Sequence, residues 1–301
     1  MKTVAIVTVN YDTEADTHAL LASLKKIKPA DFTFTTIIID NGSKVPFLLE
    51  KHEEATVIRL ETNTGFTGGY NTGMKKALAD GSEYILIINN DTLVAPDMLI
   101  QLLAPFEHDK KIGVTVPKIY FAKGNEFHKD RYKKEDLGNV LWYAGGFMDW
   151  ENVTSVHRGV DEVDHGQYEK QEKITFATGC CMLFKRKVLE GVSLFDERYF
   201  LYYEDADLNK RILDAGHTVV YVPQANLWHV NASSSGSGSA LHDYFLTRNQ
   251  MLFGMKYAPL RSKIALIRQS IRLLTSGRKY QKQGIRDFYL GRFGKGTFFK
   301  K

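Results

Sequence analysis

Two acidic stretches of the sequence carry residue types that could do chemistry. Asp91 stands in "NNDT", directly after the apolar run "YILIIN", and a carboxylate there is a hard oxygen ligand suited to Mg²⁺ or Mn²⁺. Glu204 and Asp205 follow the aromatic run "YFLYY" at 199–203. Apolar walls of this kind raise the pKa of a carboxylate and favour its use as a base. A base beside a metal-bound diphosphate would serve group transfer.

Each of these acids also has a structural interpretation. An aspartate at a strand end often caps a turn, and acids in the first turn of a helix are stabilised by the helix dipole. His229 follows the last strand-like run and is either a core histidine or a further metal ligand. The serine-rich segment 228–239 has the composition of a mobile loop, which could close over phosphates.

The elements that must position these side chains alternate along the first third of the chain. Short β-branched runs predict strands, and apolar residues at helical spacing predict helices between them. The predicted strands are 3–9, 35–40, 55–60 and 84–89, and the predicted helices are 13–28, 45–52 and 68–80. Such alternation favours an α/β fold with a mostly parallel sheet covered on both faces. Ligands of these sheets bind beyond the carboxyl ends of the strands.

Polar residues stand at these strand ends. Asp40 could accept the N3–H of a pyrimidine, with Asn10 and Tyr11 framing its ring. The glycine-rich stretch "NTGFTGGYN" allows a backbone to approach a ligand, although such stretches also serve as simple turns. The candidate donor-binding residues at the strand ends are Asn10, Tyr11, Asp40, Asn63, Gly65, Asn71 and Asn90.

The rest of the chain divides into an irregular part, a regular part and a basic tail. Residues 123–172 read as an insertion, and Trp142, Gly145 and Gly146 within it could line an acceptor pocket together with Tyr203, although core packing explains the tryptophan equally well. A strand, a short helix, an aromatic loop, a helix and a last strand are predicted over 174–223. The tail from Leu241 to Arg292 is predicted to be mostly helical.

Composition and charge narrow the class of protein. The 301 residues, 44% hydrophobic and 25% charged, contain no apolar run of about 18 residues. The amino terminus does not resemble a signal peptide, so a cytoplasmic protein is expected. Cys180 and Cys181 are adjacent and are expected to be small core residues. Residues 256–301 hold 13 Lys or Arg and one acid, Asp287, whereas the remainder holds 27 basic and 34 acidic residues.

That basic tail has several uses. In 264–274, Ile264, Ile267, Ile271 and Leu274 share a helical face, with Arg268 and Arg272 opposite, and such a face often packs on the parent domain. It could instead hold the protein at the cytoplasmic face of an anionic inner membrane, or form a homo-oligomer interface. No nucleic-acid-binding motif is present, so nucleic acid is not an expected partner.

Five stretches of the chain, taken in order, resemble the family 2 inverting nucleotide-sugar glycosyltransferases of GT-A fold. They are "VNYD", "IIIDNGS", "NTGFTGGYNTGM", "INNDTLVAPDML" and "FDERYFLYYEDADLNKRILDAGH". The resemblance covers most of residues 3–255. The stretch "HDYFLTRNQMLF" with the tail "GIRDFYLGRFGKG" is most similar to the rhamnosyltransferase branch. The implied organisation is a GT-A catalytic domain over residues 1–240 and a helical basic C-terminal extension over 241–301. Within the catalytic domain, residues 1–120 would be the nucleotide-binding half and residues 121–240 the acceptor-binding and catalytic half.

The resemblance also implies roles for individual residues. Asp40 would contact the nucleobase, Asp91 would bind a divalent cation (Mg²⁺ or Mn²⁺), and Asp205 would be the catalytic base. Tyr244 and Arg248 would lie near the donor diphosphate. Asn89 stands where the metal-binding pattern has its first aspartate, which implies a weaker dependence on metal.

The expected activity is inverting transfer of a hexose or deoxyhexose, L-rhamnose among them, from a dTDP- or UDP-sugar. The acceptor would be a hydroxyl of a glycan, lipid-linked or glycoprotein molecule in cell-surface polysaccharide or glycoconjugate synthesis. A sugar nucleotidyltransferase would instead place a glycine-rich, Arg-containing loop after the first strand, where this chain has "NYDTEAD". A catalytically weak carbohydrate-binding or regulatory relic of the same fold is the other alternative.

Overall fold

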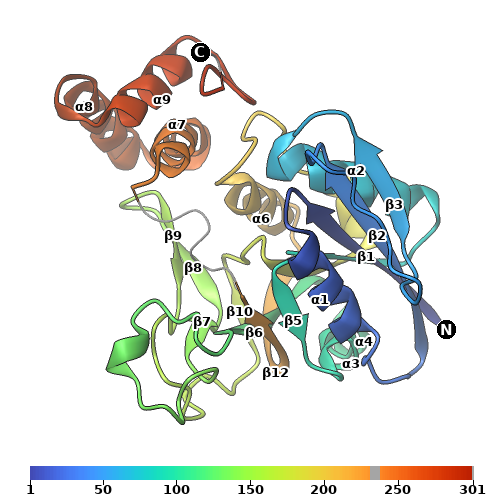
Figure 1. The fold of residues 1–301 in the computed structure, drawn as a ribbon. Helices are drawn as coiled ribbons and strands as arrows, with labels where there is room; N and C mark the ends of the chain where they lie inside the picture. The colour runs from blue at the N-terminus through green and yellow to red at the C-terminus, as the bar shows by residue number, and fades with distance from the viewer. Residues whose placement is uncertain (231–237, 300–301) are drawn as a thin grey trace.

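The computed structural model describes residues 1–230 and 238–299, which form a curled mixed sheet with helices packed against it (Figure 1). Within these residues, ten strands make one sheet, in which β5 and β7 pair with β12 and β6 and the other strands follow the order β10-β12-β6-β11-β4-β1-β2-β3. Strands β8 and β9 form a separate hairpin. The expected lid falls largely at 231–237, outside the described residues.

The predicted parallel half is confirmed. Its strands are β1 (Lys2–Asn10), β2 (Phe32–Asn41), β3 (Thr56–Leu60) and β4 (Tyr84–Ile88). Its crossover helices are α1 (Glu14–Leu24) and α2 (Gly65–Ala79), on opposite faces of the sheet in Figure 1. All neighbouring pairs among these strands are parallel, and Asn10 lies in register with Asp40. The polar strand ends therefore meet at one edge.

The helix predicted over 45–52 is absent. Pro46 has no N–H to donate, and the backbone N–H of Phe47 donates to the Asp40 carboxylate over 3.0 Å. The backbone N–H of Glu50 likewise donates to the Glu53 side chain over 2.8 Å. These backbone N–H groups therefore donate to side-chain carboxylates and not to the carbonyls of a helix.

In the second half of the sheet, β11 (Cys181–Lys185) runs antiparallel between β4 and β6 (Ile112–Phe121). Strand β12 (Thr218–His229) is parallel to β6 and pairs with the short β5 (Thr92–Val94). Helices α3 (Met98–Leu103), α4 (Pro105–His108), α5 (Arg186–Val192) and α6 (Glu204–Asp214) complete this half. Cys180 and Cys181 are free and buried, as expected.

The insertion between β6 and β11 is short-stranded and irregular, as predicted. It contains a 3₁₀ turn (Lys129–Arg131), β7 (Leu141–Tyr143), β8 (Gly146–Asp149), β9 (Thr154–His157) and β10 (Glu172–Ile174). Strand β10 pairs with β12 at the edge of the main sheet and β7 pairs with β6, so the insertion is attached to the parent domain through two strands.

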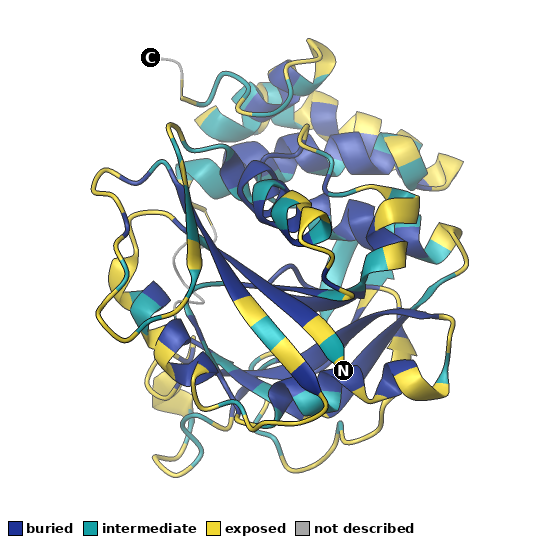
Figure 2. Cartoon of the chain, turned by 90° about the vertical axis from the view of Figure 1, so that its right-hand side faces the viewer, coloured by how far each residue is buried: buried dark blue, intermediate teal, exposed yellow. Residues whose placement is uncertain are grey.

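The tail is helical, as predicted, with α7 (Ala240–Tyr257), α8 (Leu260–Ser276) and α9 (Lys279–Tyr289). Figure 2 shows these helices buried on their inner faces and exposed on their outer faces. The interpretation that Ile264, Ile267 and Ile271 pack on the domain is wrong, because they are 43%, 38% and 57% exposed, whereas Leu274 of the same predicted face is partly buried against the core. The buried residues of α8 are instead Ser262, Leu266 and Ser270.

Candidate active site

The strand ends are joined by a network of buried amides and hydroxyls. The Asn10 side chain donates to Ser43 over 3.1 Å and accepts from the Thr17 hydroxyl over 2.9 Å. The Asn90 amide donates to that same hydroxyl over 2.8 Å and to Thr13 over 2.7 Å. The ends of β1, β2 and β4 are thereby fixed to the first turn of α1. Thr17 and Ser43 were not predicted as site residues, and their position beside "VNYD" and "DNGS" was the available signal.

Asp40 is buried at the end of β2. Its carboxylate accepts from the backbone N–H groups of Ser43 and Phe47, and it forms an ion pair with Arg59. Burial alone would raise the pKa of Asp40, but these hydrogen bonds outweigh it and hold the pKa below its ordinary value. The carboxylate is therefore ionised and oriented at the edge where Tyr11 is 46% exposed.

The loop before α2 is shaped by asparagines. Asn41 donates to the Gly65 carbonyl over 3.0 Å and accepts from the Thr64 N–H over 2.9 Å, while Asn63 accepts from the Gly65 N–H over 2.7 Å. Gly65 has φ +77°, and an added Cβ would lie 2.4 Å from the Phe200 carbonyl oxygen. Only glycine lets this loop approach the aromatic segment so closely.

Asn71 has a different position from the other predicted donor-binding residues. It is buried inside α2 and exchanges hydrogen bonds with the Phe195 backbone, donating over 2.9 Å and accepting over 3.0 Å. The side chain thereby ties α2 to the segment that leads into 199–203.

Asp91 and His229 lie side by side, with 3.1 Å between the carboxylate and the imidazole Nε2. Pairing of β5 with β12 places them there, because Thr92 is in register with His229 and the Val230 N–H donates to the Asp91 carbonyl over 2.8 Å. The buried Nδ1 of His229 has no hydrogen-bond partner among the described residues. A carboxylate beside an imidazole is a suitable pair of ligands for a divalent cation.

The pair is a partial donor set. Across residues 1–230 and 238–299, no group of three or more His, Cys, Asp or Glu side chains is placed to hold a metal ion. Asn89 is directed elsewhere, since its side-chain oxygen accepts from the Tyr70 hydroxyl over 3.1 Å. A cation at Asp91 and His229 would therefore need further ligands of another kind, such as the oxygens of a bound diphosphate.

Asp205 is held by two backbone groups at the start of α6. Its Oδ2 accepts from the Gly179 N–H over 3.0 Å and its Oδ1 from the Ala206 N–H over 2.8 Å. Burial nevertheless dominates and raises the pKa of Asp205 to about 6. Burial, together with the charge of Asp205, raises the pKa of Glu204 well above its ordinary value. Glu204 Oε2 has no hydrogen-bond partner among the described residues, so nothing there offsets the effect of burial on its pKa.

The two acidic sites approach the same short segment of chain. Asp205 accepts from Gly179, and the next residue, Cys180, accepts at its carbonyl from the Asn89 N–H over 2.9 Å. The negative charge of Asp91 contributes to the raised pKa of the Cys180 thiol, after burial. Residues 179 and 180, which lead into β11, thus connect Asp205 to the end of β4, two residues before Asp91.

The aromatic segment before Asp205 has an unusual backbone. Phe200, Tyr202 and Tyr203 have φ values of 67°, 68° and 70°, a region that bulky residues rarely adopt. Asn249 of α7 holds the segment by donating to three of its carbonyls. These belong to Tyr199 (2.8 Å), Leu201 (2.8 Å) and Tyr202 (2.9 Å). Asn249 was not predicted, and its place beside Arg248 in "TRNQ" was the only signal.

Tyr244 and Arg248 are fully buried and bonded to protein atoms. The Tyr244 hydroxyl donates to Asp287. The Arg248 guanidinium donates to the carbonyls of Tyr199 and Gly294 over 2.9 and 2.8 Å. In this arrangement neither side chain presents a free polar atom to a ligand, and Arg248 instead links the aromatic segment to the end of the chain.

The predicted acceptor residues are only partly brought together. Trp142 lies edge-on to His229, with ring centroids 4.7 Å apart, and so borders the Asp91 pair. Gly145 and Gly146 form the turn between β7 and β8, where a Cβ on Gly146 would meet Phe176 at 2.9 Å. Tyr203 is buried and its hydroxyl donates to the Val153 carbonyl over 2.8 Å, which leaves it a structural contact here.

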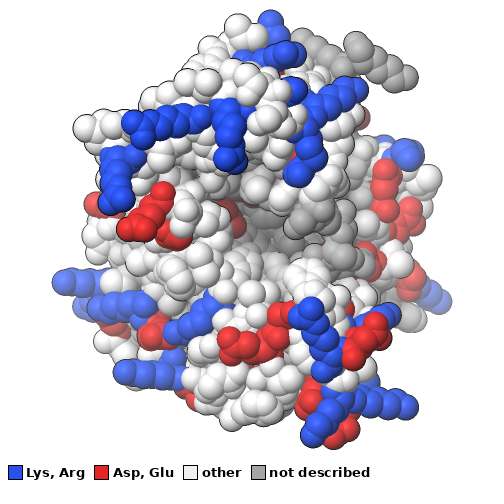
Figure 3. Space-filling model, turned by 90° about the vertical axis from the view of Figure 1, so that its left-hand side faces the viewer, with Lys and Arg blue, Asp and Glu red and all other residues white. Residues whose placement is uncertain are grey.

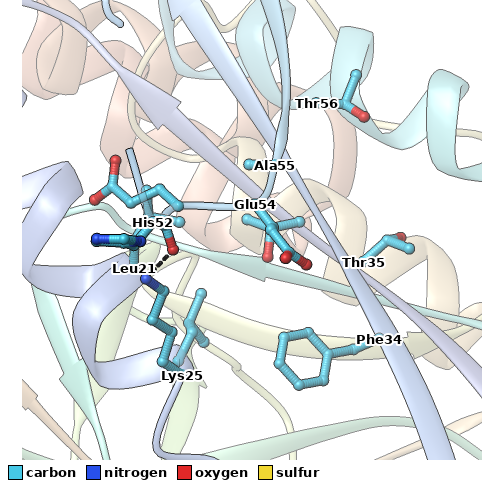
Figure 4. A pocket seen from close by; sticks show the side chains of 11 residues that line it. Leu21, Lys25, Phe34, Thr35, His52, Glu54, Ala55 and Thr56 are labelled. Atoms are coloured by element: carbon cyan, nitrogen blue, oxygen red, sulfur yellow. Dashed lines mark hydrogen bonds between the residues drawn. The ribbon is translucent and has the colours of Figure 1, made fainter. Parts of the chain in front are cut away.

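A cavity of about 490 Å³ lies away from these residues, between α1 and the strands β2 and β3 (Figure 4). Phe34, Thr35, His52 and Lys25 line it, and the Lys25 ammonium donates to the His52 carbonyl. Thr35 pairs with Ala5, five residues before Asp40 in β2. The cavity therefore lies toward the opposite end of the strands from the candidate site.

Comparisons with known proteins identify the family of the chain. The model of the family described as Glycosyl transferase family 2 matches residues 3–192. The chain belongs to this family. It is 27% identical over 251 residues to the N-acetylglucosaminyl-diphospho-decaprenol L-rhamnosyltransferase of Mycobacterium tuberculosis, covering 79% of each chain. It is 22% identical over 281 residues to a poly-beta-1,6-N-acetyl-D-glucosamine synthase of Staphylococcus aureus, covering 88% of this chain and 61% of that one.

Among solved structures, the fold is similar to that of GalNAc-T7 crystallised with UDP, GalNAc and Mn²⁺. The TM-score is 0.61 at 18% identity, over 90% of this chain and 55% of that one. The expected GT-A fold and the expected glycosyltransferase class are therefore confirmed.

Proposed function

We propose that this family 2 glycosyltransferase moves a hexose or deoxyhexose, such as L-rhamnose, from a nucleoside-diphosphate sugar to an acceptor hydroxyl with inversion. The observation that carries the proposal is that Gly179 donates to Asp205 while the next residue, Cys180, accepts from Asn89, two positions before Asp91. The similarity to a mycobacterial rhamnosyltransferase and to an N-acetylglucosamine polymer synthase supports a place in cell-surface glycan synthesis.

Asp205 is the proposed base. Its desolvated carboxylate accepts the proton of the acceptor hydroxyl as that oxygen attacks the anomeric carbon, and the bond to the diphosphate breaks on the opposite side. The two backbone N–H groups fix both carboxylate oxygens in direction. Burial and the charge of Asp205 raise the pKa of Glu204 beside it, which disfavours a second negative charge on the pair.

The strand-end edge is the proposed donor site. Asp40 would accept the N3–H of uracil or thymine beside Tyr11, and the loop at Asn63 and Gly65 would approach the ribose and phosphates. Asp91 and His229 would hold a Mg²⁺ or Mn²⁺ ion, which supplies positive charge to the departing diphosphate. The Asp91–His229 pairing and the unpartnered Nδ1 of His229 support this assignment.

The acceptor is proposed to be a glycan or a lipid-linked glycan. The name of the mycobacterial relative includes a diphospho-decaprenol acceptor, which supports the lipid-linked form. Trp142 offers a planar face beside His229 on which a sugar ring could stack. Residues 1–120 would then bind the donor and 121–240 the acceptor, with 241–301 as the helical extension.

A panel of nucleotide sugars tests the proposal. The purified protein should be stabilised against heat by a dTDP- or UDP-sugar in the presence of Mg²⁺ or Mn²⁺, and slow release of nucleoside diphosphate should follow. Stabilisation without any release, with or without glycan acceptors, would favour the carbohydrate-binding relic. Failure of every nucleotide sugar to stabilise the protein would refute the donor site.

A further inference from the structure

Helix α8 carries an apolar stripe on its outer surface. Leu260, Ile264, Ile267 and Ile271 are 74%, 43%, 38% and 57% exposed. Their spacing of four, three and four residues places them on one side of the helix, over about 16 Å of its length. We call these four residues the α8 stripe. Single exposed apolar side chains are ordinary, but an aligned row of this length marks an interaction surface.

Arginines border the stripe along one flank. Arg261, Arg268 and Arg272 are exposed and each follows a stripe residue by one position, which is about 100° around the helix. The expectation that Arg268 and Arg272 lie opposite the apolar face is therefore corrected, since the opposite side of α8 packs on the protein. The buried side is formed by Ser262, Leu266 and Ser270, and Ser262 donates to the Trp150 carbonyl over 2.7 Å.

The surface around the stripe is strongly cationic. Figure 3 shows Lys and Arg gathered in a band over the C-terminal helices, above a hollow in the same face. The one acid among residues 256–301, Asp287, is buried and accepts from Tyr244 and Thr297. That segment therefore exposes no acidic side chain beside the stripe.

We propose that the α8 stripe docks the enzyme on the surface of an anionic phospholipid bilayer, with the helix lying in the plane of the membrane. The isoleucines would enter the headgroup boundary and the flanking arginines would contact lipid phosphates. Among residues 1–230 and 238–299 no helix is long and apolar enough to cross a bilayer. The docking is peripheral.

Charge complementarity favours lipid over other partners. A second copy of the chain would bring two cationic surfaces together, which opposes association. A nucleic acid would match the charge but would leave the isoleucine row without an apolar contact. An anionic lipid surface matches both the charge and the stripe.

Vesicle flotation tests the inference on the full chain, without donor or acceptor, so its result is independent of the proposed transferase activity. Wild-type protein should float with vesicles of equal parts phosphatidylglycerol and phosphatidylcholine at about 0.05 M salt, and much less at about 0.5 M. It should not float with pure phosphatidylcholine. The variant I264S/I267S/I271S should bind at least about tenfold more weakly, and R261Q/R268Q/R272Q about a hundredfold more weakly at low salt.

Matched controls lie on exposed positions elsewhere. Val45 and Leu48 are 61% and 74% exposed, and V45S/L48S should bind like wild type. The variant K44Q/K51Q/K110Q removes the same charge as the arginine variant from other exposed positions and should retain most binding. No flotation with anionic vesicles, or undiminished flotation of the isoleucine variant, would overturn the inference. So would light scattering that shows a dimer which the isoleucine variant loses.

Discussion

Replacing Asp205 by asparagine is the sharpest test of the catalytic assignment. The change keeps the shape of the side chain but removes the group that accepts a proton, so turnover should fall by about 10² to 10⁴-fold. That loss corresponds to about 2.7 to 5.4 kcal/mol of transition-state stabilisation. In addition, the amide NH₂ would face one of the N–H donors of Gly179 and Ala206, at a cost of about 1 kcal/mol or more in folding stability.

The pH dependence gives a second readout. A carboxyl group acts as a base only when ionised, so wild-type turnover should rise as the pH increases through about 6, the raised pKa of Asp205, and then level off. The turnover of Asp205→Asn should not show this rise near pH 6. The charge of Asp205 also helps to raise the pKa of Glu204, and the variant should lower that pKa.

The assay is release of nucleoside diphosphate at saturating donor and acceptor, with donor affinity measured separately by calorimetry. Asp214→Asn is the control, because Asp214 ends the same helix, is 55% exposed at its side chain and pairs with Lys210. Donor affinity should be unchanged in both variants. Turnover within about a factor of ten of wild type, with the rise near pH 6 intact, would refute the role of Asp205.

Three further substitutions test the supporting geometry. Asn249→Ala should lower the free energy of unfolding by about 3 kcal/mol, because three carbonyls of 199–202 lose their donor; a loss under about 1 kcal/mol in urea unfolding would contradict this. Gly65→Ala should destabilise by at least about 2 kcal/mol through the 2.4 Å approach to Phe200, whereas Gly81→Ala, at φ +83° with nothing within 4 Å, should cost less in thermal unfolding. Asp91→Asn should weaken donor binding about tenfold or more in Mg²⁺ but little in a chelator, and calorimetry that shows equal affinities for wild type and variant in Mg²⁺ would exclude the metal assignment.

Much of the parallel half could be predicted because its signals are local. Runs such as 35–40 and 84–89 are rich in β-branched residues, most of them buried, and each ends in polar residues, so strand ends and a shared edge follow from pattern alone. The helix predicted over 45–52 was wrong because the prediction used only the apolar spacing within the segment. Asp40, five residues before the segment, accepts from the Phe47 N–H, and that spacing gives no information about it. The backbone conformation of 45–52 is therefore determined by a hydrogen-bond partner that lies outside the segment.

The candidate site shows the same division. Asp91, His229 and Asp205 could be proposed from residue type and position. The contacts of Asp205 with Gly179 and of Asn89 with Cys180 depend on the antiparallel insertion of β11 between β4 and β6, which the sequence pattern did not predict. The buried side of α8 also could not be predicted from the hydrophobic pattern of its sequence. Small residues make that contact, as where Leu266 approaches Gly254 so closely that a Cβ there would lie 2.2 Å away. Hydrophobic periodicity points to the isoleucines instead.

The anchoring of Arg248 by Gly294 affects how the C-terminal end can be manipulated. The Gly294 N–H donates to the Arg198 carbonyl over 2.8 Å, while its carbonyl accepts from Arg248, which also holds the Tyr199 carbonyl. Deleting residues after 290 would release this guanidinium and loosen the segment that precedes the base. A truncated enzyme would lose activity for that reason alone, so point substitutions on the outer face of α8, and not deletions, separate lipid binding from catalysis.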